Sequence, residues 1–256
     1  MTPDIKPLVA GNWKMNGQRD QLDQLALLAQ GVDQDLAQNV DVVVCPPATL
    51  LYVATTLSED TPLFVGAQDC HHEEKGAHTG DISAEMIADC FADFCIVGHS
   101  ERRTDHHESD FHVAGKAQAC WRAGLTAIIC IGETEAQYDA GMAKEVLAKQ
   151  IATSVPPGGT EDDTIIAYEP VWAIGTGKTP SPEDISDIHA FIREELATRF
   201  GGHGERMRIL YGGSVKPENA PEILSLMNVD GALVGGASLQ ASSLLAICET
   251  YRNISV

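Results

Sequence analysis

Short apolar runs rich in β-branched residues recur along the chain, and each is followed by a stretch in which apolar and polar positions repeat with a helical period. This alternation predicts βα units that share a parallel sheet. Division of 256 residues among eight units leaves 256/8 = 32 residues for each, an ordinary βα repeat. We therefore expect one domain over residues 1–256. The eight runs are residues 5–12, 40–45, 63–68, 94–98, 127–132, 164–169, 208–212 and 231–235.

Two of the intervening stretches carry an apolar stripe at helical spacing, which predicts a helix packed against the strands in each. Capping residues predict two helix starts, because Thr134 is followed three residues later by Gln137, and Ser181 precedes a proline at the first helical position. These starts fall just after the fifth and sixth runs. The stripes consist of Leu22, Leu25, Leu28, Val32 and Leu36, and of Ile185, Ile188, Ile192 and Leu196.

Eight βα units can form either an open doubly wound sheet or a closed barrel. The first βα turn lacks the G-x-G-x-x-G pattern of a nucleotide fold, and no second half repeats such a fold. The pattern therefore favours an α/β protein with a single (β/α)8 barrel. In such a barrel the functional residues lie on the loops that follow the carboxyl ends of the strands.

The charge balance narrows the possible partners. Lys and Arg total 17 against 37 Asp and Glu, which gives a formal net charge of −20. Such a charge repels nucleic acid and acidic membrane surfaces, so we expect neither as a partner. An anionic metabolite would need a local positive site built from a few cations and helix N-termini.

The sequence also favours a cytoplasmic protein. The first eleven residues lack the basic and apolar regions of an export signal, and the charge-free stretch 231–248 is too polar to span a membrane. The seven cysteines are odd in number and show no CxxC spacing, which indicates reduced thiols in the cytosol.

Polar residues follow several of the predicted strands. Asn12 and Lys14 come at the end of the first, His99 after the fourth, Glu169 at the end of the sixth and Ser214 after the seventh. Together they supply a cation, an imidazole and a carboxylate. Gly235 and Gly236 follow the eighth strand, and the last two loops of a barrel commonly expose main-chain N–H groups to a phosphate.

These segments resemble the triosephosphate isomerase family, and the resemblance covers essentially the whole chain in order. The matching runs are GNWKMN, VGHSERR, CIGET, YEPVWAIGTGK, YGGSV and GALVGGASL. Six matches at the expected strand ends of an eightfold βα pattern make coincidence implausible. The resemblance implies a TIM barrel that interconverts dihydroxyacetone phosphate and D-glyceraldehyde 3-phosphate in glycolysis and gluconeogenesis, without cofactor or metal.

The resemblance implies a role for each polar residue at the strand ends. Glu169 is expected to be the base that moves a proton between adjacent carbons, and a water-poor pocket can keep a carboxylate basic enough for this. His99 is expected to polarise the carbonyl as a neutral imidazole, with its pKa lowered by a helix that starts at Ser100. Lys14 and Asn12 are expected to stabilise the oxyanion and phosphate, and Glu101 to hold Lys14 by an ion pair.

The segment after the sixth strand is expected to be a lid that excludes water and protects the intermediate. Gly175 would donate its N–H to the phosphate, which Ser214, Gly235 and Gly236 would also bind. Pro180 stands at the exit hinge, where the family more often has a small flexible residue. The lid residues are Pro170, Val171, Trp172, Ala173, Ile174, Gly175, Thr176, Gly177, Lys178 and Thr179.

The long polar connection 69–80 resembles the family's dimer loop, so we expect a homodimer in which the tip at Thr79 reaches the partner's active site. Asp69 and Asp81 depart from the family's usual Asn and Glu. The histidines and Cys70 of this loop fit no zinc spacing, so we expect no metal.

Several alternatives remain open. Glu169 alone could be a structural carboxylate, His99 a core histidine, Lys14 a surface charge, and Glu101 a partner of a neighbouring arginine. At the level of function, the same mechanism could act on a four-carbon sugar phosphate. The barrel could also be a catalytically silent binding protein, or Lys14 could form a Schiff base as in an aldolase.

Overall fold

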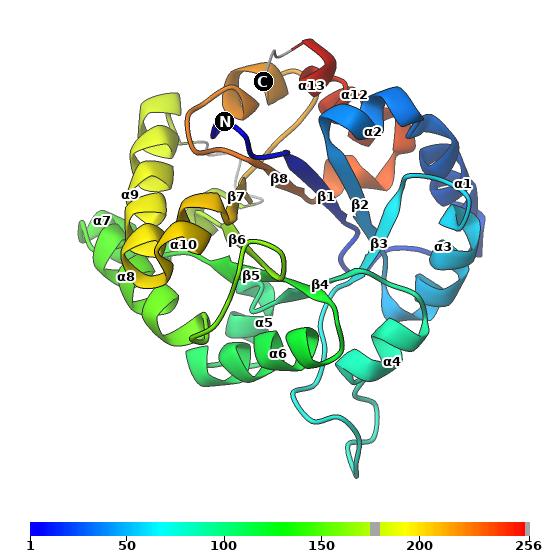
Figure 1. Cartoon of the computed structure of the whole chain (residues 1–256), viewed down its shortest axis with the longest axis horizontal. Helices are drawn as coiled ribbons and strands as arrows, with labels where there is room; N and C mark the ends of the chain where they lie inside the picture. The colour runs from blue at the N-terminus through cyan, green and yellow to red at the C-terminus, as the bar shows by residue number, and fades with distance from the viewer. Residues whose placement is uncertain (175–179, 254–256) are drawn as a thin grey trace.

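The computed structural model describes residues 1–174 and 180–253, and within them eight parallel strands close into a barrel (Figure 1). Each strand pairs with its neighbours in chain order, and β8 pairs back with β1. The predicted barrel is confirmed, because every predicted apolar run overlaps one strand. The strands are β1 Leu8–Asn12, β2 Asp41–Cys45, β3 Phe64–Ala67, β4 Phe94–Val97, β5 Thr126–Ile131, β6 Thr164–Tyr168, β7 Arg208–Tyr211 and β8 Gly231–Val234.

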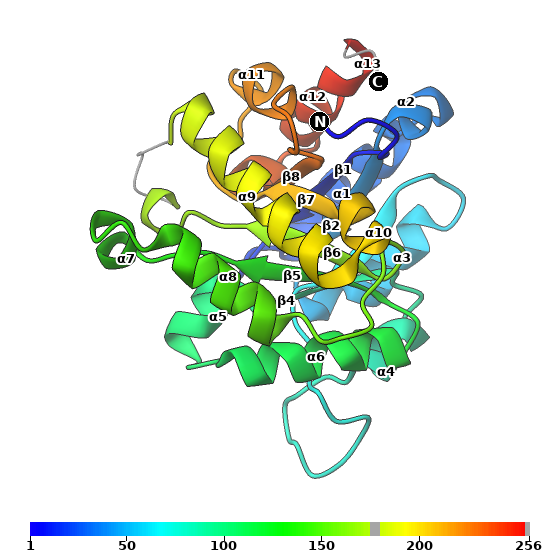
Figure 2. The ribbon, with the colours of Figure 1, turned by 60° about the vertical axis from the view of Figure 1, so that its left-hand side comes forward.

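Helices surround the barrel on its outer side, as Figures 1 and 2 show. None of the helices in the described ranges is long and apolar enough to cross a membrane. The α-helices are α1 Leu22–Gly31, α2 Gln34–Asn39, α3 Leu51–Ser58, α4 Ala84–Asp89, α5 Ser100–Asp105, α6 Asp110–Arg122, α7 Glu135–Asp139, α8 Ala143–Ser154, α9 Pro182–Phe200, α10 Gly202–Arg206, α11 Ala220–Leu224, α12 Ala241–Cys248 and α13 Thr250–Asn253. The 3-10 helices are η1 Arg19–Gln21, η2 Ala48–Leu50, η3 Val171–Ala173 and η4 Gly236–Leu239.

The strands divide the core into two layers, because successive side chains point to opposite faces of a strand. On β5, Ile128 and Cys130 pack inside the barrel, whereas Ile129 and Ile131 face the helices. All four side chains are buried. The inner layer fills the barrel, and polar side chains at the carboxyl ends of several strands line one cavity.

Two predicted helix starts are confirmed, and one predicted helix is wrong. Thr134 and Ser181 cap α7 and α9 through the predicted capping boxes. The stripe from Leu22 to Leu36 does not lie on one helix, however, because α1 ends at Gly31 and α2 begins at Gln34. The Asp33 side chain accepts a hydrogen bond from the Leu36 N–H at 2.7 Å, and this cap starts the second helix.

The connection between β3 and α4 projects from the barrel (Figures 1 and 2). Its base is closed by a hydrogen bond of 2.7 Å from the His71 N–H to the Ile82 carbonyl. Thr79, which we expect to form the tip, is exposed. This loop therefore extends away from the rest of the barrel.

Candidate active site

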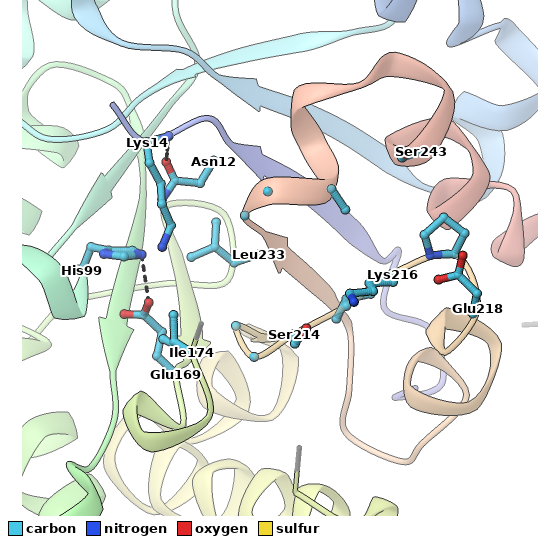
Figure 3. A pocket seen from close by; sticks show the side chains of 17 residues that line it. Asn12, Lys14, His99, Glu169, Ile174, Ser214, Lys216, Glu218, Leu233 and Ser243 are labelled. Carbon is cyan, nitrogen blue, oxygen red and sulfur yellow. Dashed lines mark hydrogen bonds and ion pairs between the residues drawn. The ribbon is translucent and has the colours of Figure 1, made fainter. Parts of the chain in front are cut away.

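A cavity of about 580 Å³ opens at the carboxyl ends of the strands. The side chains of Asn12, Lys14, His99 and Glu169 point into it from three different strand ends (Figure 3). Ile174, Ser214, Gly235 and Gly236 also line it. The structure thus brings together predicted site residues from both halves of the chain.

Glu169 follows β6 directly and is 2 % exposed. Its carboxylate lies 2.9 Å from His99 Nε2 and accepts hydrogen bonds from the Ser100 N–H at 3.0 Å and the Ser100 hydroxyl at 3.2 Å. Burial acts to raise the pKa of Glu169, but His99 and Ser100 outweigh it and leave this pKa below its ordinary value. In this arrangement the carboxylate is therefore a weaker base than an ordinary glutamate.

His99 is the N-cap of α5, so the predicted helix start at Ser100 is confirmed. Its Nδ1 accepts a hydrogen bond from the Glu101 N–H at 3.2 Å, which directs Nε2 toward Glu169. Burial acts to lower the pKa of His99, but the Glu169 charge and hydrogen bond raise it above its ordinary value. The expected lowering of this pKa by the helix is wrong here, because the neighbouring carboxylate has the larger effect.

Gly98 sets the position of His99 at the end of β4. It adopts a φ of +68°, and a Cβ at this residue would lie 2.7 Å from two methyl carbons of Val113. Only glycine combines this backbone conformation with such a close approach to α6. The sharp turn lets the imidazole point into the cavity while α5 begins at the next residue.

Lys14 has a left-handed backbone, with φ of 53°, which is uncommon for a residue other than glycine. Its N–H donates to Asn12 Oδ1 at 2.9 Å, and its Nζ lies 2.6 Å from Glu101 Oε1. The ion pair that the resemblance implies for Glu101 is thus present. The side chain of Lys14 runs beside Gly235, since a Cβ there would lie 3.5 Å from Lys14 Cε.

Gln68 holds the Lys14 backbone and was missed by the sequence reasoning. Its Nε2 donates to the carbonyls of Lys14 and Cys45, each at 2.9 Å. Gln68 closes the predicted third run, and a polar residue at the carboxyl end of a barrel strand is the signal that could have identified it.

The loops after β7 and β8 form the far side of the cavity. Ser214 follows β7, while Gly235 and Gly236 lead into η4, whose first turn faces the cavity. The N–H groups of a first helical turn attract anions. Together with the Lys14 side chain, which runs beside Gly235, this arrangement offers the local positive site that an acidic protein needs for an anion.

The described part of the predicted lid runs from Pro170 to Ile174 and contains η3. Trp172 Nε1 donates to Glu133 Oε1 at 2.7 Å, and its ring stacks on Tyr138 with ring centroids 4.2 Å apart. The Tyr168 hydroxyl donates to the same Glu133 oxygen at 3.1 Å. Sequence reasoning missed Glu133, although it stands in the matched run CIGET. The predicted lid residues Gly175, Thr176, Gly177, Lys178 and Thr179 lie outside the described residues.

The projecting loop borders a second cavity of about 950 Å³, which Lys14 also lines. Asp69, at the start of the loop, lies 2.7 Å from Lys116 Nζ and 2.9 Å from Arg102 NH2. Burial raises the pKa of Asp69 to about 6 despite these two cations. Asp69 replaces the asparagine that is usual in the family, and its carboxylate is paired with Lys116 and Arg102. Met15, which is 96 % exposed, lies at the edge of the same cavity.

Comparisons with known proteins agree over the whole chain. A family model described as triosephosphate isomerase matches residues 7–251. The chain is 58% identical to a triosephosphate isomerase of Rhizobium meliloti, with both chains covered in full, and 55% identical to one of Brucella abortus, with 99% of this chain and 100% of the relative covered. A crystal structure of triosephosphate isomerase from Bartonella henselae is 46% identical, with a TM-score of 0.91 over 97% of this chain and 100% of that one.

Proposed function

The chain belongs to the triosephosphate isomerase family and is an isomerase, and from this premise we propose that it interconverts dihydroxyacetone phosphate and D-glyceraldehyde 3-phosphate through an enediol(ate). The proposal is supported by the convergence of Glu169, His99 and Lys14 on one cavity that Ser214, Gly235 and Gly236 also line. A carboxylate, a hydrogen-bond donor and a cation around one site can move a proton between adjacent carbons with no cofactor.

Glu169 is proposed as the base. Its carboxylate is held by His99 and Ser100, so a substrate carbonyl that takes the place of the carboxylate at His99 Nε2 releases these contacts. Burial is the largest influence on the pKa of Glu169 and acts to raise it. Release therefore makes the carboxylate more basic at the moment when it meets the carbon-bound proton.

His99 is proposed as the electrophile. Because its Nδ1 accepts the Glu101 N–H, the neutral ring carries its proton on Nε2, the nitrogen that faces the cavity. Once the carboxylate has moved away, burial and the α5 N-terminus both disfavour the imidazolium. The ring can then donate to the carbonyl oxygen and return a proton to the neighbouring one.

Lys14 and the loops after β7 and β8 are proposed to bind the phosphate and the developing oxyanion. Lys14 is held by Glu101 and Gln68, and Asn12 is fixed by the Lys14 N–H. A preorganised cation in a partly closed cavity stabilises charge that develops during the reaction. Ser214, Gly235 and Gly236 would contact the phosphate on the opposite side, together with Gly175 of the lid.

We place the whole protein in the cytoplasm, where it would act in glycolysis and gluconeogenesis. It would be a single domain that forms a homodimer through the loop that contains Thr79. All seven cysteines are free, which is compatible with a reducing compartment. The proton transfer needs no metal or cofactor.

Turnover with different sugar phosphates tests this proposal. The purified chain is expected to convert both triose phosphates in a coupled assay and to act on four-carbon analogues at least about a hundredfold more slowly, because a longer chain misplaces the reacting carbon. Faster turnover of the tetrose phosphates would show that the substrate is a four-carbon sugar phosphate. Inactivity on both the triose and the tetrose phosphates would indicate a binding protein without catalytic activity. Trapping of substrate on Lys14 by borohydride would instead indicate Schiff-base chemistry, although the pairing of Lys14 with Glu101 supports an electrostatic role.

A further inference from the structure

Three cysteine side chains meet outside the catalytic cavity. Cys70 lies at the start of the projecting loop, Cys95 on β4 and Cys120 on α6. Their sulfur atoms all lie within 4.8 Å of one another, and the Cys70 and Cys120 sulfurs are 3.7 Å apart. The three residues are at most 2 % exposed. None of them has a part in the proposed reaction.

The spacing of these sulfurs is close to that of a thiolate metal site. A Zn–S bond of about 2.3 Å places two thiolates roughly 3.8 Å apart in a tetrahedral site and roughly 4.0 Å apart in a planar trigonal one. The Cys70–Cys120 distance already matches the tetrahedral value. A third sulfur within 4.8 Å needs to move by less than about 1 Å to complete a three-sulfur set.

The electrostatic surroundings favour a thiolate at one of the three cysteines. Hydrogen bonds from Cys120 and Cys95 hold the pKa of Cys70 well below its ordinary value, and the positive charge of Lys116 acts in the same direction. The same hydrogen bonds and burial raise the pKa of Cys95 and of Cys120, so a bound metal ion would have to displace their protons. A divalent cation with three thiolates carries one net negative charge, and the Lys116 ammonium near the cluster is shared with Asp69 and Glu108. Lys116 lies one helical turn before Cys120 on α6.

Cys70 also gives the cluster a route to solvent, because it lines the cavity of about 950 Å³ beside the projecting loop. A second group of ligand atoms lies nearby, from His71, His78 and Asp81, but it is less suited to a metal. His71 Nδ1 accepts the Glu73 N–H, so the neutral ring carries its proton on Nε2, the nitrogen that faces Asp81. In the thiol cluster Cys70 and Cys95 donate only weak S–H hydrogen bonds, to the Lys116 carbonyl at 3.7 Å and the Ile96 carbonyl at 3.5 Å, and metal binding would release these protons.

We propose that Cys70, Cys95 and Cys120 form a three-thiolate binding site for a thiophilic d10 cation of the Zn²⁺ type. Thiolates are the ligands that select such ions. The bound ion would tie the start of the projecting loop to β4 and α6, so its occupancy would stabilise the loop that we assign to the dimer. The ligands come from three separate elements, 25 residues apart in each case, and so match no local zinc motif.

Cadmium titration tests the site directly. The full chain is stripped of metal with a chelator, kept reduced with a phosphine, and titrated with Cd²⁺ while thiolate-to-cadmium charge-transfer absorption is recorded. One equivalent of Cd²⁺ is expected to produce this absorption. Cys120→Ala is expected to weaken binding by at least about tenfold, as loss of a group that supports a metal does. Cys248→Ala removes an equally buried thiol from α12 and is expected to leave binding unchanged.

Two further variants keep the test decisive. Cys95→Ser is measured beside Cys120→Ala, and far-ultraviolet circular dichroism and isomerase activity show which variants are folded. Equal Cd²⁺ affinity in folded Cys120→Ala and Cys248→Ala, or binding without charge-transfer absorption, would overturn the proposal. So would loss of binding in His71→Gln, because it would assign the ion to the loop histidines.

Discussion

The contact between His99 and Glu169 controls the ionisation of both residues. With the two groups 2.9 Å apart, Glu169 raises the pKa of His99 and His99 lowers the pKa of Glu169. Burial opposes both changes. Substrate must therefore break this contact before the pKa of His99 can fall and the pKa of Glu169 can rise, as the proposed mechanism requires.

Removal of the Glu169 carboxylate should show how burial alone changes the pKa of His99. In Glu169→Gln the pKa of His99 is expected to fall below its ordinary value, because burial then becomes the dominant influence. Titration of the His99 ring by nuclear magnetic resonance measures this. An unchanged His99 pKa in the variant would show that the pair does not control the ring.

The same pair predicts how stability depends on pH. The raised pKa of His99 contributes stability below its unfolded value, and this contribution is lost as pH rises through the folded pKa. The lowered pKa of Glu169 contributes stability above its unfolded value, which is lost as pH falls through the folded pKa. In Glu169→Gln the carboxylate contribution is absent and the lowered pKa of His99 reverses the sign of the other contribution. The stability measured by urea unfolding should therefore rise, not fall, as pH increases through the pKa of His99. Identical pH profiles would contradict the linkage.

Gln68 is expected to act as a positioning residue for Lys14. Gln68→Ala removes two hydrogen bonds that hold the left-handed backbone of Lys14, at a cost of about 1–3 kcal/mol in unfolding free energy. We expect kcat/KM to fall by at least about tenfold, since a displaced cation stabilises the transition state less well. Steady-state kinetics and urea unfolding measure both quantities. Gln24→Ala, which loses one hydrogen bond to Ala241, is the control expected to keep its kcat/KM.

At the scale of elements, the entry to the lid is anchored by Glu133. Trp172→Phe removes the N–H that donates to this buried carboxylate, while stacking on Tyr138 can persist. A hydrogen bond to a charged group contributes about 1.5–3 kcal/mol, so we expect kcat to fall by roughly tenfold or more if closure of the lid depends on this contact. Stopped-flow and steady-state kinetics provide the measurement. A kcat equal to that of the wild type would show that the Trp172–Glu133 hydrogen bond does not contribute to catalysis.

The strands could be predicted from the sequence because each buried run ends in polar or glycine residues at the carboxyl end of a barrel strand. The capping boxes at Thr134 and Ser181 were equally local and therefore readable. The break at Asp33 was missed because the apolar stripe continues through it in the correct phase.

Contacts across the barrel could not be predicted in the same way. His99 and Glu169 are seventy residues apart, and their contact depends on barrel closure and on the turn at Gly98. The directions of their pKa shifts follow from that contact, which is why the predicted lowering of the His99 pKa was wrong. The hydrogen bonds of Gln68 and Glu133 likewise need the three-dimensional arrangement.

At the scale of the whole molecule, the net charge of −20 repels anions, so a phosphorylated substrate would need a locally positive site. In the proposed mechanism, Lys14 and the first turn of η4 would provide that site in the cavity. The projecting loop lies beside the second cavity, which Lys14 also lines. In the proposed dimer, the partner's loop would cover this region, and assembly would thereby support the position of Lys14.

Disruption of the loop tip tests the dimer. Thr79→Arg is expected to shift the protein to monomers and to lower kcat/KM, because a long charged side chain cannot enter a closely packed interface. Light scattering after size exclusion gives the mass, and Ser225→Arg, on the exposed end of α11, is the matched control. A dimeric Thr79→Arg variant with wild-type activity would contradict the proposed role of this loop.

The central claim is that the carboxylate of Glu169 transfers the proton within this cavity. It is tested most directly by the rate of triose phosphate interconversion in Glu169→Gln, compared with Glu218→Gln, which changes another carboxylate that lines the same cavity. We expect a loss of at least about a thousandfold in kcat for Glu169→Gln and a change of less than about threefold for Glu218→Gln. Comparable activity in the two variants would contradict the assignment of Glu169 as the base.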